Sequence, residues 1–98
     1  MTIEKKLNGN ELIMEIKGRL DTVTASELES SLRQSLAGIE TLIFDPKDME
    51  YISSAGLRVL LSTQKIMNAR GTMKIINVSE TVAEVFEVTG FSDILNIE

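Results

Sequence analysis

The sequence predicts an α/β domain with a mixed, mostly parallel sheet of four to five strands, an N-terminal antiparallel hairpin and at least three helices. A hairpin pattern opens the chain. Helical and strand patterns then alternate, as in crossover connections between parallel strands. The 98 residues, 43% hydrophobic and 26% charged, have the composition of one ordinary globular domain. We therefore expect a single domain over residues 1–98.

The hairpin is predicted from a turn and from alternation. Residues 2–8 (TIEKKLN) read as a short strand, and Gly9 supplies the turn that follows. In the next segment (LIMEIKG), Leu12, Met14 and Ile16 share one face, and the other face is mostly polar. This pattern is typical of a half-buried hairpin.

A helix and a short strand are expected next. Residues 24–38 (TASELESSLRQSLAG) have a possible capping box at Thr24 and Glu27, and Gly38 suits the helix end. The apolar positions of this helix recur at helical spacing, at Ala25, Leu28, Leu32 and Leu36. Residues 40–46 (ETLIFDP) predict a strand that is apolar on both faces and ends at Pro46.

Two more helices and a strand complete the predicted order. Residues 53–71 form a helix that ends at Gly71, with a core stripe of Leu57, Leu60, Leu61 and Met67. Residues 72–78 (TMKIINV) form a strand. Residues 79–90 form a helix capped by Ser79 and stopped by Gly90. The tail, residues 91–98, is expected as a short edge strand or a turn.

Composition excludes several classes of function. A net charge of −5 and a pI of about 4.7 argue against a nucleic-acid partner. The chain has no cysteine and no histidine, so thiol chemistry and the commonest general base are absent. No apolar run approaches the ~20 residues of a membrane span. The start, MTIEKKLNG, lacks the apolar core of a signal peptide, so we expect a cytoplasmic protein with no membrane insertion.

The stretch YISSAGLRVLLS, residues 51–62, carries the main candidate site. Ser53 and Ser54 lie where a strand leads into a helix. Serine is among the best helix caps, and from the residues alone a cap is the favoured role. The alternative is a phosphoryl acceptor, because the first turn of a helix favours an anion. Ala55 and Gly56 would leave the hydroxyl open to a large partner.

Enzymatic chemistry has no support in the sequence. No histidine activates the serines, and Lys65 lies too far along the helix to pair with Ser54. Neither a nucleophile elbow nor a phosphate-binding loop is present. Asp45, Asp48 and Glu50 surround Pro46, and a solvated loop is favoured over a cation site there because calcium-loop spacing is missing. We expect no metal site.

Asp21 is the remaining candidate. It follows one strand and precedes a helix, and the simplest role for it is that of a turn residue. Ser54 is placed in the same way after another strand. Since parallel strands deliver into their helices at one edge of a sheet, Asp21 and Ser54 are expected at the same end.

Three segments together resemble the STAS domain, the module of anti-sigma factor antagonists. They are GRLDTVTASEL (residues 18–28), TLIFDPKDMEYISSAGLRVLL (41–61) and VTGFSDIL (88–95). The resemblance covers nearly the whole chain and implies the STAS fold. It implies a regulatory protein that binds an anti-sigma factor serine kinase, is switched off by phosphorylation and is restored by a phosphatase. It also implies that the domain holds no cofactor, because the ATP belongs to the kinase. An alternative is a constitutive STAS scaffold subunit, for example of a lipid-transport complex.

The resemblance places the phosphoacceptor at Ser54, with Ser53 as the alternative. The family motif reads aspartate-serine-serine/threonine-glycine-leucine and aligns on Gly56 and Leu57. Ser53 then occupies the aspartate position, and Ala55 occupies that of the second hydroxyl. In the family, this aspartate carries a negative charge that helps to orient the acceptor serine and to contact the kinase. The resemblance therefore implies that this chain lacks that charge.

The implied binding surface combines two turns and the start of a helix, with Asp21 beside the acceptor. Leu57 and Arg58 are expected to be exposed there. The partner-binding residues expected from the resemblance are Asp21, Thr22, Thr24, Tyr51, Ile52, Ser53, Ser54, Ala55, Gly56, Leu57 and Arg58. The Met and Leu stripes can all be used by one core, so a monomer is expected.

Overall fold

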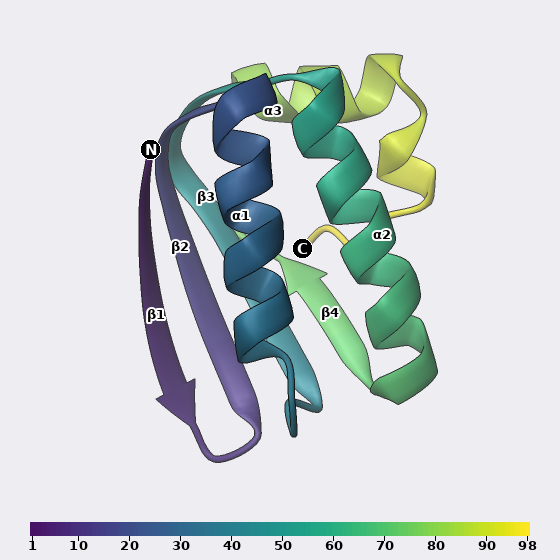
Figure 1. Ribbon diagram of the computed structural model, residues 1–98. Coiled ribbons are helices and arrows are strands. Elements are labelled where there is room, and N and C mark those ends of the chain that lie inside the picture. Colours follow the sequence, from purple (N-terminus) through teal and green to yellow (C-terminus); the bar gives the residue numbers. More distant parts are fainter.

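A computed structural model describes all 98 residues, and its elements alternate as the sequence predicts (Figure 1). The elements are β1 (Thr2–Asn8), β2 (Glu11–Leu20), α1 (Thr22–Ser35), β3 (Thr41–Ile52), α2 (Ser54–Arg70), β4 (Thr72–Ile75), α3 (Glu80–Val88) and a short 3-10 helix, η1 (Phe91–Asp93).

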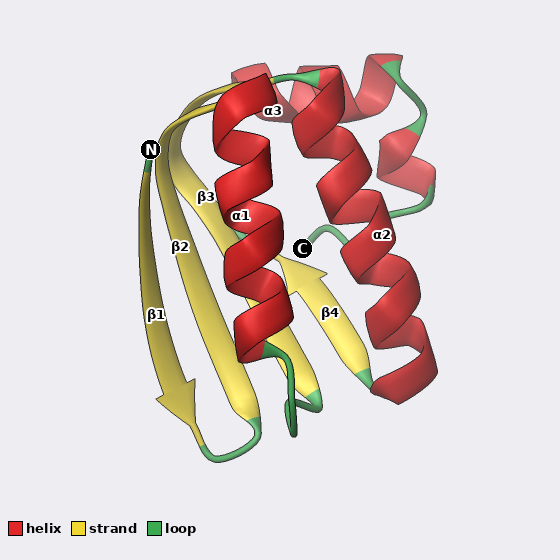
Figure 2. Ribbon diagram, viewed as in Figure 1, coloured by secondary structure: helices red, strands yellow, loops and turns green.

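The four strands form one mixed sheet in the order β1-β2-β3-β4. β1 pairs with β2 in antiparallel fashion, and the other two pairs are parallel. Helices α1 and α2 cover one face of the sheet, and α3 lies behind their upper ends (Figure 2). The predicted α/β class, opening hairpin and mostly parallel sheet are therefore confirmed.

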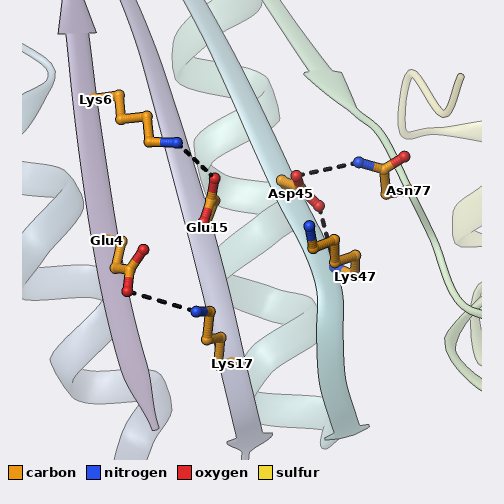
Figure 3. Close-up of polar contacts among 7 residues, drawn as sticks. All are labelled: Glu4, Lys6, Glu15, Lys17, Asp45, Lys47 and Asn77. Atoms are coloured by element: carbon orange, nitrogen blue, oxygen red, sulfur yellow. Dashed lines mark hydrogen bonds and ion pairs between the residues drawn. The ribbon is translucent and has the colours of Figure 1, made fainter.

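The core lies between the sheet and its helices. Leu12, Met14 and Ile16 are buried, as the alternation along β2 predicts. On the opposite face the same strand pair carries charged side chains: the Lys6 ammonium lies 3.2 Å from Glu15, and that of Lys17 lies 3.5 Å from Glu4 (Figure 3). The hairpin is thus apolar toward the helices and charged toward solvent.

Helix α1 begins earlier than predicted, because its cap lies three residues before Thr24. The predicted capping box at Thr24 and Glu27 is wrong, because the cap is Asp21. The Asp21 carboxylate accepts from the amides of Val23 and Thr24, both at 3.0 Å. The Asp21 amide in turn donates to the Thr24 hydroxyl at 2.8 Å. A carboxylate meets two free amides at once, so the helix starts there.

Strand β3 does not end at Pro46, as predicted, but continues to Ile52. Its pairing with β2 has two irregularities. At the first, Glu15 opposes Asp45 but Lys17 opposes Asp48, and a second shift in register follows. Pro46 lies inside the first bulge, where the ladder is already interrupted and no amide is required. The three acidic residues around it therefore belong to a strand and not to a loop.

Asp45 is the one acidic side chain of that group that is buried. One of its carboxylate oxygens accepts from the Lys47 amide and the other from the Asn77 side chain, each at 3.1 Å (Figure 3). Asn77 has a positive φ of 54°. The pair ties the bulge of β3 to the turn that leads into α3, and it satisfies the buried carboxylate without a cation.

The C-terminal tail lies along β4, at the edge of the sheet. The sequence predicts either a short edge strand or a turn for this segment. Ile97 forms a parallel bridge with Ile75. The Ile75 amide donates to the Asn96 carbonyl at 2.9 Å, and the Glu98 amide donates to Ile75 at 2.8 Å. None of the helices has both the length and the hydrophobicity of a membrane span.

Gly71 gives the first testable prediction. A Cβ at this residue would overlap the backbone carbonyl oxygen of Glu40, which cannot move without disturbing β3. We expect Gly71→Ala to lower the free energy of unfolding by about 1–3 kcal/mol, measured by urea denaturation. Ala69→Gly, in the exposed last turn of the same helix, is the control and should cost at most ~1 kcal/mol. A Gly71→Ala variant as stable as the wild type would contradict this packing.

Candidate functional site

Helices α1 and α2 begin side by side at the same end of the sheet, where β2 and β3 finish. Their preceding strands are parallel neighbours, and Leu20 at the end of β2 pairs with Ile52 at the end of β3. The Ser53 amide donates to the Leu20 carbonyl at 2.8 Å. The expectation that Asp21 and Ser54 lie at the same end of the sheet is therefore confirmed.

The first turn of α2 rests directly on the sheet because Gly56 has no side chain. A Cβ at Gly56 would lie 2.7 Å from Cγ of Leu20 and 3.0 Å from Cγ1 of Ile52. Leu20, Ile52 and Gly56 are all buried. The close approach fixes how α2 is rotated at its start, which determines which side chains point outward.

The two serines have different local roles. Ser53 is the helix cap, and its hydroxyl accepts from the Gly56 amide at 3.2 Å. Ser54 is the first helical residue and is exposed, and its hydroxyl has no hydrogen-bond partner in the protein. The amides of Ser54 and Ala55 have no acceptor either, as is usual in the first turn of a helix. The free hydroxyl of Ser54 therefore lies beside backbone amides that have no acceptor.

Asp21 is held as an anion by its own helix. The amide of Thr24, then the Thr24 hydroxyl, lower the pKa of the Asp21 carboxyl below its ordinary value, and the Val23 amide and Arg19 add to this. The Thr24 hydroxyl also lies 2.7 Å from the carbonyl of Arg19. Asp21 therefore carries a negative charge at neutral and higher pH, at the end of the sheet where α2 also starts.

The residues expected to bind a partner divide into exposed and buried groups. The exposed group consists of Thr22, Tyr51, Ser54 and Arg58. The partly buried group consists of Asp21, Thr24, Ser53 and Ala55. Ile52, Gly56 and Leu57 are buried and support the surface from below. The expected exposure of Leu57 is wrong: the rotation of α2 that Gly56 permits turns this side chain into the core.

Val23 is a surface residue that sequence reasoning missed. Its side chain is 75% exposed and lies in the first turn of α1. The sequence contains a signal for it, since Val23 falls outside the buried stripe of Ala25, Leu28 and Leu32. We define the helix-start surface as the exposed residues Thr22, Val23, Tyr51, Ser54 and Arg58.

Tyr51 is held in place on this surface by a neighbour. The Arg19 guanidinium lies 4.3 Å from the centre of the Tyr51 ring, and the two residues are opposite each other across β2 and β3. Behind the surface, a depression of about 280 Å³ opens between α1 and α2, lined among others by Thr22, Ala55 and Arg58. No cluster of three or more acidic, histidine or cysteine side chains that could hold a metal ion is present.

Comparison with known proteins gives the family. The STAS domain model matches residues 2–98. The chain belongs to the STAS domain family. This STAS domain is 31% identical to an anti-sigma-B factor antagonist of Bacillus subtilis (strain 168), over 99% of this chain and 90% of the relative.

Solved structures agree on the fold of this STAS domain. The anti-sigma factor antagonist SpoIIAA in its unphosphorylated form superposes with a TM-score of 0.84 at 17% identity, covering 99% of this chain and 88% of SpoIIAA. Its phosphorylated form gives 0.77 at 16% identity, covering 99% and 91%. The predicted family and STAS fold are confirmed. Both of these relatives are anti-sigma factor antagonists.

The environment of Asp21 gives the second prediction. We expect its carboxyl to titrate below its ordinary pKa, and Thr24→Val to raise that pKa by removing the hydroxyl donor. Since the folded pKa is lowered, Asp21 stabilises the fold above about pH 3.9, and this contribution is lost as pH falls through the folded pKa. NMR titration of the Asp21 carboxyl carbon measures the shift.

Val23→Ala is the control for this titration, because it keeps both backbone donors. Its Asp21 pKa should match that of the wild type. An Asp21 carboxyl that titrates at its ordinary pKa in the wild type would contradict the hydrogen-bonded cap.

Proposed function

We propose that this STAS domain is an anti-sigma factor antagonist that binds an anti-sigma factor serine kinase and is switched off by phosphorylation of Ser54. The observation that carries the proposal is the free, exposed hydroxyl of Ser54 beside the cap Ser53. The named relatives, one of them solved in unphosphorylated and phosphorylated forms, support the same reading.

Ser54 is a better acceptor than Ser53 for geometric reasons. The Ser53 hydroxyl is partly buried and already accepts from Gly56, so modifying it would remove the cap of α2. Ser54 has neither restriction. A kinase can reach its hydroxyl without unfolding the helix, and a phosphatase can reach the product in the same way.

The switch would act through charge and volume at the interface. A phosphoserine carries about −1.5 to −2 charges at neutral pH. On the helix-start surface this group would add to the anionic Asp21. Burying that charge against a partner without a matched cation costs several kcal/mol, and ~1.4 kcal/mol is already tenfold in affinity. Release of the partner needs no rearrangement of the fold.

The remaining features of the proposal concern cofactors, location and the residues that make contact. The phosphoryl donor binds the kinase, so the domain holds no cofactor or metal of its own. We further propose that the domain acts in the cytoplasm. Contacts come from the helix-start surface and its partly buried neighbours Asp21, Thr24, Ser53 and Ala55, with Ile52, Gly56 and Leu57 as support.

Two substitutions test the switch. We expect Ser54→Asp to weaken binding of the anti-sigma factor at least tenfold, and Ser54→Ala to keep the wild-type affinity, measured by isothermal titration calorimetry. Ser30→Asp adds the same charge to an exposed position of α1 outside the surface and should leave the affinity unchanged. Equal affinity of both Ser54 variants would overturn the mechanism.

Intact-mass and phosphopeptide analysis of the protein from its own cells tests the acceptor. We expect a singly phosphorylated fraction that maps to Ser54. Modification at Ser53 would move the acceptor by one residue and contradict the argument from the cap. If only unmodified chain is found under every growth condition, a constitutive scaffold without phosphorylation replaces the switch.

A further inference from the structure

The two edges of the sheet differ in how they are finished. At the β4 edge, the tail covers the outer strand through the bridge between Ile97 and Ile75. At the other edge, β1 pairs with β2 alone and nothing lies outside it (Figure 1). Every side chain of β1 except that of Ile3 is exposed. The sheet therefore presents one open row of backbone donors and acceptors.

The open edge is long and regular. Its pairing with β2 runs without interruption from Thr2, opposite Lys17, to Asn8, opposite Glu11. No bulge turns the strand away, in contrast to β3. A straight edge of seven residues can accept another strand along its whole length.

We propose that β1 pairs with β1 of a second copy of this chain, antiparallel and with the twofold axis at Lys5, joining the two sheets into one. The charges of the strand select this register. Glu4 comes to lie opposite Lys6 of the second copy, and Lys6 lies opposite its Glu4. A shift of two residues in either direction would place Glu4 opposite Glu4 or Lys6 opposite Lys6, which is destabilising.

The charged face of the hairpin makes the pairing continuous. Lys17 already pairs with Glu4, and Glu15 with Lys6, across β1 and β2 (Figure 3). In the dimer, a ladder of alternating sign would run through Lys17 and Glu4 of one copy to Lys6 and Glu15 of the other. Such opposite-charge neighbours across strands are favourable.

The other face of the strand supplies an apolar contact. Leu7 is 68% exposed in the single chain, and in this register it lies opposite Ile3 of the second copy. Lys5 faces its own counterpart across the axis, but its ammonium donates to the Ser35 hydroxyl at 2.8 Å and is thereby directed toward α1 of its own copy. Two Ile3–Leu7 contacts therefore flank one pair of diverted lysines.

The expected dimer is weak, because one strand pair buries less than the ~1,200–2,000 Å² of a stable interface. We expect a Kd on the order of 0.1–1 mM, weakening as salt screens the charges. The pairing uses no residue of the helix-start surface, so it stands or falls separately from the proposed function. It replaces the monomer that the sequence leads us to expect.

Charge exchange between two variants tests the register. Glu4→Lys and Lys6→Glu each place like charges opposite each other in their own dimers and should weaken association about tenfold. In a 1:1 mixture of the two variants, every Lys faces a Glu, so association should return. Sedimentation equilibrium up to about 1 mM protein measures all four samples, wild type included.

The outcomes of this experiment are decisive in either direction. If association returns in the mixture, a folding defect cannot explain its loss in the separate variants, because the same two proteins associate when they are combined. A wild type that stays monomeric at the highest concentration overturns the proposal. So does a mixture that associates no better than its components.

A cysteine trap provides an independent measure of the register. The chain has no native cysteine, so a single Cys reports only on its own position. Lys5→Cys lies on the axis and should form a disulfide dimer at least tenfold faster than Asn8→Cys, whose counterpart lies at the far end of the strand. Equal rates for the two variants would rule out this register.

Discussion

The arrangement of this domain depends on one close contact, that of the first turn of α2 with the ends of β2 and β3. The missing side chain of Gly56 lets the helix lie against Leu20 and Ile52. The hydrogen bond from the Ser53 amide to Leu20 fixes the same junction. With the helix seated at this depth, Leu57 points into the core and Ser54 points to solvent. The chemistry of the candidate site is therefore a consequence of backbone packing.

A second constraint shapes the other half of the molecule. The two bulges bend β3 so that its last residues run beyond β4, which pairs only with residues 41–44. Asp45 sits at this bend and joins it to Asn77. Buried carboxylates are retained where their hydrogen bonds are complete, and this one links the strand to the entry of α3. This contact therefore helps to join the bend of β3 to the segment that leads into α3.

Periodicity predicted the elements that follow simple patterns. The alternation of Leu12, Met14 and Ile16 gave the buried face of β2. The residues themselves pointed to the strand-to-helix turn, and the family resemblance then indicated Ser54 as the acceptor. The errors occur where two signals compete. Pro46 indicates a strand end unless a bulge accommodates it, and a bulge depends on the partner strand. Asp21 and Thr24 are both good caps, and only the geometry of the turn decides between them. For Leu57, helical spacing indicates the core and the family resemblance indicates the surface, and the structure agrees with the spacing.

The pairing of a cap with a free hydroxyl bears on how such a site can vary through evolution. Position 53 must accept from the Gly56 amide, a requirement that serine and aspartate meet about equally well. The aspartate of the family motif and the serine of this chain are therefore interchangeable as far as the helix is concerned. Position 54 has no such duty to the fold. Selection for stability acts on position 53 and not on position 54. A hydroxyl that is retained at position 54 among descendants is therefore retained for function and not for folding.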